Sequence, residues 1–171
     1  MKRWILTLIA SLLISQSVST PLAHADLSNF TTRFSASDAP LSLALSYDGQ
    51  YQILASQTQG IYISSDYGWY WTKTLDASAN AFEFAAVAIT TDGSTMYAGT
   101  EGAIGPQGTT VNGGYLYKST DYGLTWTQLT SAGTKLWSKI AVSDDGTKLV
   151  ATTEATTGFV SGNYVITKNP E

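Results

Sequence analysis

The sequence contains no cysteine. It therefore cannot form disulfides, and it offers no thiol nucleophile, cysteine metal ligand or lipid-modified cysteine. Histidine occurs once, at His24, and Arg33 is the only arginine after residue 25. Histidine is the usual general base or metal ligand near neutral pH, and no metal-ligand spacing, P-loop or dinucleotide glycine pattern is present. We therefore expect no metal and no cofactor.

Long hydrophobic runs are also missing after residue 25, so no later segment is expected to span a membrane. The one apolar run, residues 4–14, follows a basic start and precedes the small-x-small pattern Ala23-His24-Ala25. We interpret residues 1–25 as a signal peptide cleaved after Ala25, with an uncleaved anchor as the alternative. This predicts a secreted or periplasmic protein with no membrane association after cleavage.

Basic residues are scarce in the chain that remains, residues 26–171, which has a length typical of one domain. Without Lys2 and Arg3, seven basic residues stand against 13 acidic ones, a formal net charge of −6. Such a chain is a poor nonspecific binder of phosphate backbones and anionic lipids, so we expect no nucleic-acid partner. Asn29 begins a glycosylation sequon that matters only in a eukaryotic host.

An eight-residue pattern occurs twice, as SSDYGWYW at residues 64–71 and STDYGLTW at residues 119–126. A third copy begins at Thr167-Lys168-Asn169, close to the last residue of the sequence. The aspartate can accept backbone N–H bonds within a turn, and the glycine allows a backbone conformation that other residues resist. The tryptophan then begins the next strand and supplies a large ring for packing between sheets. We expect each copy to fix a hairpin.

Asp-Gly pairs at residues 48–49, 92–93 and 145–146 each follow one β-rich segment and precede another, which is a strong hairpin signal. Short aromatic and β-branched segments around these pairs and the eight-residue patterns predict strands, and no helical periodicity is present after the signal peptide. The predicted strands cover residues 41–46, 51–56, 60–65, 71–75, 84–90, 95–100, 114–119, 126–130, 137–143, 148–153 and 163–168, with 30–34 as a further candidate.

Four short antiparallel strands that recur every 40–55 residues or so are typical of a β-propeller blade. A β-sandwich also has short strands, but it has no reason to repeat one turn sequence. We therefore predict an all-β fold with three blades in residues 26–171, approximately 26–71, 72–126 and 127–171.

The repeated pattern resembles the Asp-box, or BNR repeat, of sialidase-like, sortilin-like and xyloglucanase-like β-propellers. The second copy fits S-x-D-x-G-x-T-W at every position, whereas the first has Tyr70 in place of threonine. The third copy has Asn169 in place of the aspartate and ends before the glycine. The resemblance implies that the box is structural and lies away from the ligand-binding face. The structural residues it implies are Ser64, Asp66, Gly68, Trp71, Ser119, Asp121, Gly123, Thr125 and Trp126.

Two glutamates are weak catalytic candidates, because Glu101 and Glu154 each open a long loop after equivalent strands. Glycoside hydrolysis needs such a pair of carboxylates, although a solvated glutamate at the start of a loop is also ordinary. Sialidase activity is excluded, since the resemblance implies a cluster of three arginines and only Arg33 remains. Exposed aromatic rings favour sugar binding instead. The predicted ligand-binding residues are Trp69, Tyr70, Glu101 and Glu154.

The predicted function is a secreted, non-catalytic binding module for carbohydrate or a cell-surface macromolecule, with a fragment of a propeller glycoside hydrolase as the alternative. A scaffolding repeat without a small ligand is a third possibility.

Three blades fall short of the four to eight of ordinary propellers, so we also predict a homodimer that closes a six-bladed ring. An incomplete gene, or the first part of a longer propeller, is the competing explanation. Asp144-Asp145-Gly146 is interpreted as a hairpin turn rather than a calcium loop.

Overall fold

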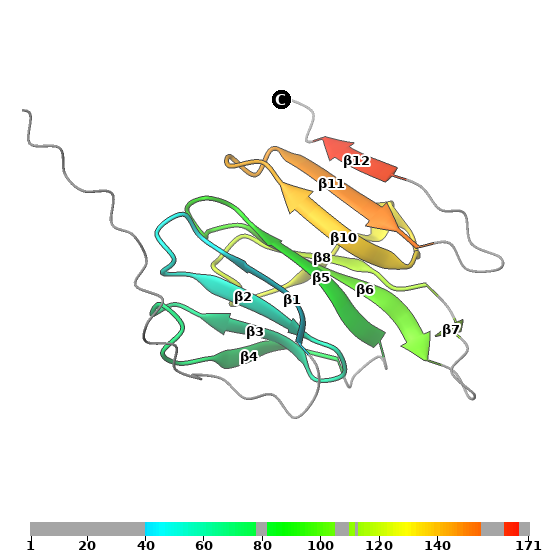
Figure 1. Ribbon diagram of the computed structural model, residues 1–171. Helices are drawn as coiled ribbons and strands as arrows, with labels where there is room; N and C mark the ends of the chain where they lie inside the picture. The colour runs from blue at the N-terminus through cyan, green and yellow to red at the C-terminus, as the bar shows by residue number, and fades with distance from the viewer. Residues whose placement is uncertain (1–39, 78–81, 105–109, 112, 155–162, 168–171) are drawn as a thin grey trace, which may run out of the picture. The chain divides into compact units, whose positions relative to one another are not determined.

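The computed structural model describes residues 40–77, 82–104, 110–111, 113–154 and 163–167 (Figure 1). All of them fall within one compact unit, residues 32–171. The predicted signal peptide, Asn29 and the candidate strand at residues 30–34 lie outside the described residues, as does Asn169 of the third box.

Three antiparallel sheets follow one another along the described chain, which confirms the all-β prediction (Figure 1). In each sheet the strands pair in chain order, except that β7 joins the second sheet beside β6. The first sheet contains β1 (Pro40–Leu45), β2 (Gln52–Ser56), β3 (Gly60–Ser64) and β4 (Thr72–Asp76). The second contains β5 (Phe82–Ile89), β6 (Met96–Ile104), β7 (Thr110–Val111), β8 (Leu116–Ser119) and β9 (Thr127–Gln128). The third contains β10 (Trp137–Val142), β11 (Lys148–Thr153) and β12 (Asn163–Thr167).

The three Asp-Gly turns have one hydrogen-bond pattern, which confirms the predicted hairpins. In each turn a hydroxyl donates to the aspartate two residues later at 2.6 Å, and the backbone N–H five residues later donates back to that hydroxyl. The glycine has a positive φ of 70–79° in all three turns, a conformation that glycine adopts without strain. The pattern binds the strand before the turn to the strand after it. The hydroxyl and aspartate pairs are Ser46–Asp48, Thr90–Asp92 and Ser143–Asp145.

Two hydrophobic clusters hold neighbouring sheets together. Because side chains alternate across a strand, β6 serves both clusters: Met96 joins the cluster between the first and second sheets, and Tyr97 joins the cluster between the second and third. Ile53 and Ile61 of the first sheet belong to the first of these clusters, and both are fully buried. Each sheet is therefore one layer in a stack of sheets that pack face to face.

The second sheet differs from the sequence prediction near Glu101. Strand β6 continues through this residue to Ile104, so the prediction that Glu101 opens a loop is wrong. The reason is that β5 is also longer than predicted and pairs with this extension, with Glu83 opposite Gly102, while β7 pairs with its far end. The backbone groups of the extension therefore have ladder partners. Strand β9 is shorter than predicted and is followed by a 3-10 turn at Thr130–Ala132, where no helical residue was expected.

The third sheet has a pairing that does not match the predicted third box. In the two complete boxes the first serine lies opposite an equivalent residue of the preceding strand: Ser64 faces Gln52, and Ser119 faces Met96. The residue of the third sheet that is equivalent to Gln52 and Met96 is Leu149, and it lies opposite Ile166. The position of the box serine is therefore occupied by Ile166, and Thr167 is the residue after it. The register of the β11–β12 pairing therefore differs by one residue from that of the two complete boxes.

Candidate functional site

The second box is a closed set of hydrogen bonds around Asp121. Ser119 Oγ donates to Asp121 Oδ1 at 2.7 Å, and the backbone N–H of Thr125 donates to the same oxygen at 2.9 Å. Thr125 Oγ1 donates to the other oxygen, Oδ2, at 2.6 Å. The Thr125 hydroxyl and backbone bonds, with that from Ser119, lower the pKa of Asp121 to about 2. Trp126 closes the turn by donating its ring N–H to Gly123 O at 3.1 Å.

The first box repeats most of this set but lacks one donor. Asp66 Oδ1 accepts from Ser64 Oγ at 2.8 Å and from the backbone N–H of Tyr70 at 2.9 Å, and Trp71 again donates to Gly68 O. Because Tyr70 stands where the second box has Thr125, no neighbouring hydroxyl of the box donates to Asp66 Oδ2. The pKa of Asp66 is lowered, chiefly by the Tyr70 backbone bond. The replacement leaves Asp66 Oδ2 available to accept a hydrogen bond beside the exposed ring of Tyr70.

A tyrosine in each box adopts a left-handed backbone conformation, with φ of 63° at Tyr67 and 59° at Tyr122. This conformation is uncommon for a residue with a bulky side chain and costs on the order of 1–3 kcal/mol. It is held by a bond from each tyrosine N–H to a backbone carbonyl beyond the Asp-Gly turn of the same sheet, at Gln50 and Ser94. The boxes thus present their tyrosines in fixed positions.

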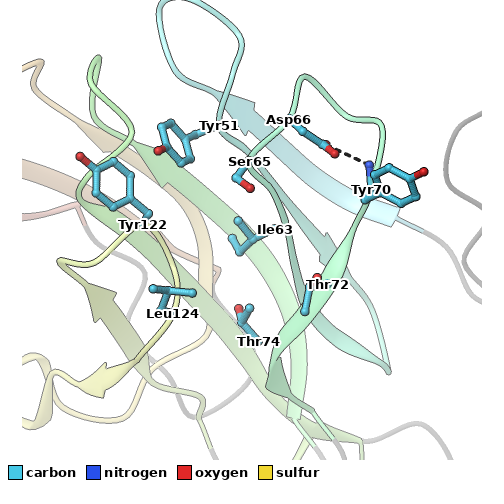
Figure 2. Close-up of a pocket in the computed structure, with 9 residues that line it drawn as sticks. All are labelled: Tyr51, Ile63, Ser65, Asp66, Tyr70, Thr72, Thr74, Tyr122 and Leu124. Atoms are coloured by element: carbon cyan, nitrogen blue, oxygen red, sulfur yellow. Dashed lines mark hydrogen bonds between the residues drawn. The ribbon is translucent and has the colours of Figure 1, made fainter.

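A pocket of about 350 Å³ lies between the first sheet and the second box (Figure 2). Tyr51 and Tyr122 stand together on one side with their ring centroids 4.5 Å apart, and Tyr70 stands on the opposite side. Tyr70 is 80% exposed. The pocket therefore combines aromatic faces with hydroxyl and carboxylate groups. Its lining residues are Tyr51, Ile63, Ser65, Asp66, Tyr70, Thr72, Thr74, Tyr122 and Leu124.

The structure separates the predicted ligand-binding residues into two places. Tyr70 lines the pocket, while Trp69 is next to it in the chain, 56% exposed and outside the lining. Glu101 and Glu154 lie elsewhere: Glu101 is within β6, in the half away from the Asp-Gly turn, and Glu154 directly follows β11. Only Tyr70 of the four residues therefore belongs to the pocket.

Glu101 is surrounded by charges from three other residues that influence its titration. Burial raises the pKa of Glu101, and the charges of Glu154 and Glu83 raise it further, while Lys139 opposes them. Glu83 was not recognised in the sequence, because nothing in its own segment marks it; its carboxylate accepts from Gln57 Nε2 at 2.9 Å. The group resembles a paired-carboxylate site in composition. Among the described residues, no group of three or more histidine, cysteine, aspartate or glutamate side chains is placed to hold a metal ion.

Sequence reasoning missed most of the pocket. Tyr51 and Tyr122 come from different sheets, and Leu124 projects from the second box, so their meeting depends on how the sheets pack. The one sequence feature that pointed to the pocket was the departure from the box pattern at Tyr70.

In the described part of the chain, no helix has the length and apolar character needed to cross a membrane.

Comparisons with known proteins show the fold. No protein-family model and no curated protein matches the chain. Among solved structures, a GH74 xyloglucanase from Xanthomonas campestris matches with a TM-score of 0.54 at 19% identity, over 74% of this chain and 20% of that one. A GH74 enzyme from Niastella koreensis gives a TM-score of 0.54 at 21% identity, over 72% and 20% of the two chains.

YCF48 from Cyanidioschyzon merolae is similar to the same degree, with a TM-score of 0.53 at 14% identity over 77% of this chain and 37% of that one. These structures are all β-propellers, and the chain spans only a fifth to about 37% of their lengths. Completion of a propeller by other chains is compatible with such partial coverage. With its successive antiparallel sheets, whose strands are connected by tight Asp-Gly turns and boxes, this chain has the β-propeller fold, of which it supplies a part.

Proposed function

We propose that this chain is an exported, non-catalytic β-propeller module that binds carbohydrate, either free or displayed on a surface macromolecule. The observation that supports the proposal is the pocket beside the first box, where Tyr70 replaces the threonine of the second box. Sugar rings present apolar faces that stack on aromatic side chains and hydroxyl groups that need hydrogen-bond partners. The pocket offers both, and its volume of about 350 Å³ lies within the usual range of ligand sites, about 300–1,000 Å³.

Each side of the pocket has its own role in the proposal. In this proposal the stacked pair Tyr51 and Tyr122 forms one wall. The exposed ring of Tyr70, which lies on the opposite side, turns onto the ligand when the ligand binds. Asp66 Oδ2 accepts a sugar hydroxyl in place of the threonine hydroxyl that Asp121 receives in the second box. Thr74 contributes less, because its Oγ1 already accepts the ring N–H of Trp126 at 3.1 Å.

A glycan array with the purified chain identifies the ligand, and calorimetry on the best glycan then measures two variants. Tyr70→Ala removes a ring without disturbing the box, because Tyr70 contributes only its backbone N–H to Asp66. We expect a loss of affinity of about tenfold or more, which corresponds to about 1.4 kcal/mol. Tyr47→Ala is the matched control, since Tyr47 is 89% exposed and lies outside the pocket.

Two results would contradict this proposal. One is an array without any bound glycan, which together with a protein partner in a pull-down would favour a scaffolding role. The other is binding that Tyr70→Ala leaves unchanged.

The alternative function is a fragment of a propeller glycoside hydrolase, and the raised pKa of Glu101, to which burial and the charge of Glu154 both contribute, favours it specifically. The raised pKa of Glu101 suits a general acid, and the two carboxylates are of the kind that glycoside hydrolysis requires. Hydrolysis assays on the parent chain and on Glu101→Gln and Glu154→Gln distinguish the two functions. Turnover that both substitutions abolish would replace the binding proposal.

Assembly and export are further parts of the proposal. A homodimer that closes a six-bladed ring, and a signal peptide cleaved after Ala25, both remain predictions of the sequence. Mass spectrometry of the protein recovered from a secreting host gives the N-terminus directly, and a chain that still carries residues 1–25 would contradict the cleavage.

A further inference from the structure

The first sheet has an apolar face that no described residue covers. In β1 the side chains alternate: Ala44 packs against the cluster shared with the second sheet, whereas Leu41, Leu43 and Leu45 are 45%, 69% and 54% exposed. Three leucines in a row on one face of a strand are unusual for a surface in contact with water.

The other two sheets show what normally covers this face. When the sheets are aligned on their Asp-Gly turns, Leu43 corresponds to Val87 of β5 and to Ile140 of β10. Val87 is 6% exposed in the cluster between the first and second sheets, and Ile140 packs against the cluster between the second and third. In both cases the side chain is covered by the preceding sheet. Leu43 therefore occupies a position that the repeat buries against another sheet.

The third sheet carries the other half of the same contact. Val150 of β11 is 41% exposed, and its equivalents are Ile53 of β2 and Tyr97 of β6. Ile53 is fully buried and Tyr97 is 4% exposed, and each is covered by the sheet that follows its own. The two outer faces of the stack are thus the two complementary sides of a junction that occurs twice inside the chain.

We propose that a second copy of this chain docks head to tail, with the Leu43 face of one copy against the Val150 face of the other. Two such junctions, related by a twofold axis, join two sets of three sheets. This inference rests on the homodimer of the proposed function and deepens it by naming the two faces that meet, neither of which lines the pocket.

The charged residues of the third sheet are compatible with this contact. Lys148 stands at the position of Tyr51, whose ring stacks on Tyr122 of the next box. The equivalent of Tyr122 in the first box is Tyr67, which is 60% exposed. In the docked pair, Lys148 of one copy therefore faces the Tyr67 ring of the other, so that a cation–π contact replaces the tyrosine stack. Lys139, at the position of Ser42, makes this junction more polar than the internal ones.

Light scattering on the full chain tests the association, with about twice the mass of one chain expected. Leu43→Lys and Val150→Lys should each give a monomer, because each places an ammonium group in the junction. Tyr47→Lys is the matched control and should remain a dimer, since the equivalent residues at the two internal junctions, Thr91 and Asp144, are both exposed. Circular dichroism and glycan binding at the pocket, measured on the same variants, separate loss of docking from loss of folding. A parent chain that is monomeric would overturn the proposal.

Cross-linking tests the orientation, because the chain has no cysteine of its own. Leu43→Cys and Val150→Cys chains are prepared separately and mixed with a short bis-maleimide. Head-to-tail docking predicts a cross-linked product in the mixture and little product from either variant alone. An efficient product from Leu43→Cys alone would mean that two leucine faces meet, and it would overturn the head-to-tail arrangement.

Discussion

At the scale of single residues, the difference between the two boxes comes from one position. Thr125 gives Asp121 a third strong donor, while Tyr70 gives Asp66 only a backbone N–H. The box sequence predicted the shared bonds, because serine, aspartate and glycine occur in both copies. It did not show that the exception at Tyr70 borders a pocket, since that depends on Tyr51 and on the second box.

Substitutions at these two positions should shift the pKa values of the two aspartates in opposite directions. Tyr70→Thr supplies a hydroxyl to Asp66 Oδ2, so we expect the pKa of Asp66 to fall further, toward the value of about 2 at Asp121. Thr125→Ala removes the largest cause of the Asp121 shift, and the pKa of Asp121 should rise. NMR titration of the side-chain carboxyl carbons measures both. Identical titration curves before and after Tyr70→Thr would contradict the assignment.

At the scale of elements, the strands were predictable because turn residues mark their ends. Asp-Gly pairs and boxes locate most hairpins. Successive side chains of β6 enter the two hydrophobic clusters in turn, because the second sheet is buried on both faces. The extension of β6 past Glu101 could not be predicted, because it depends on the length of β5 and on pairing with β7. The limits of β6 are therefore set by the strands that pair with it, which a local sequence pattern does not reveal.

The box glycines and the turn glycines should respond differently to substitution. A Cβ at Gly123, where φ is 82°, would lie 2.7 Å from Ile63 Cγ1 in the first sheet. A Cβ at Gly49, where φ is 76°, would meet nothing closer than Leu45 Cδ1 at 3.9 Å. Gly49→Ala should cost about 1–2 kcal/mol of unfolding free energy from backbone strain alone, and Gly123→Ala about 1–3 kcal/mol more from overpacking. Urea unfolding measures the difference, and equal losses would refute it.

At the scale of the whole molecule, five turn aspartates have lowered pKa values. Hydroxyls and backbone N–H groups lower those of Asp48, Asp66 and Asp92, and they lower those of Asp121 and Asp145 to about 2. A lowered pKa in the folded state means that the unfolded chain binds protons more readily in acid. The stability that these groups contribute is therefore fully present above the ordinary value near 3.8 and is lost as the pH falls toward 2.

Urea unfolding at several pH values should show this loss between about pH 4 and pH 2. The double variant Asp121→Asn, Asp145→Asn should be less stable than the parent at pH 7, and its stability should change less over the acid range. Asp144→Asn is the control. Asp144 is exposed and adjacent to Asp145, but the hydrogen bonds of the turn are made to Asp145. A double variant with the same acid dependence as the parent would contradict the role of these carboxylates.

The donors around the turn aspartates have a different consequence in solutions of high ionic strength. Asp48, Asp92 and Asp145 are held by hydroxyl and amide groups at 2.6–3.0 Å, not by lysine or arginine. Dissolved ions screen attraction between opposite charges, but they act weakly on short hydrogen bonds to neutral donors. The hairpins of this repeat should therefore keep their geometry from dilute buffer to concentrated brine.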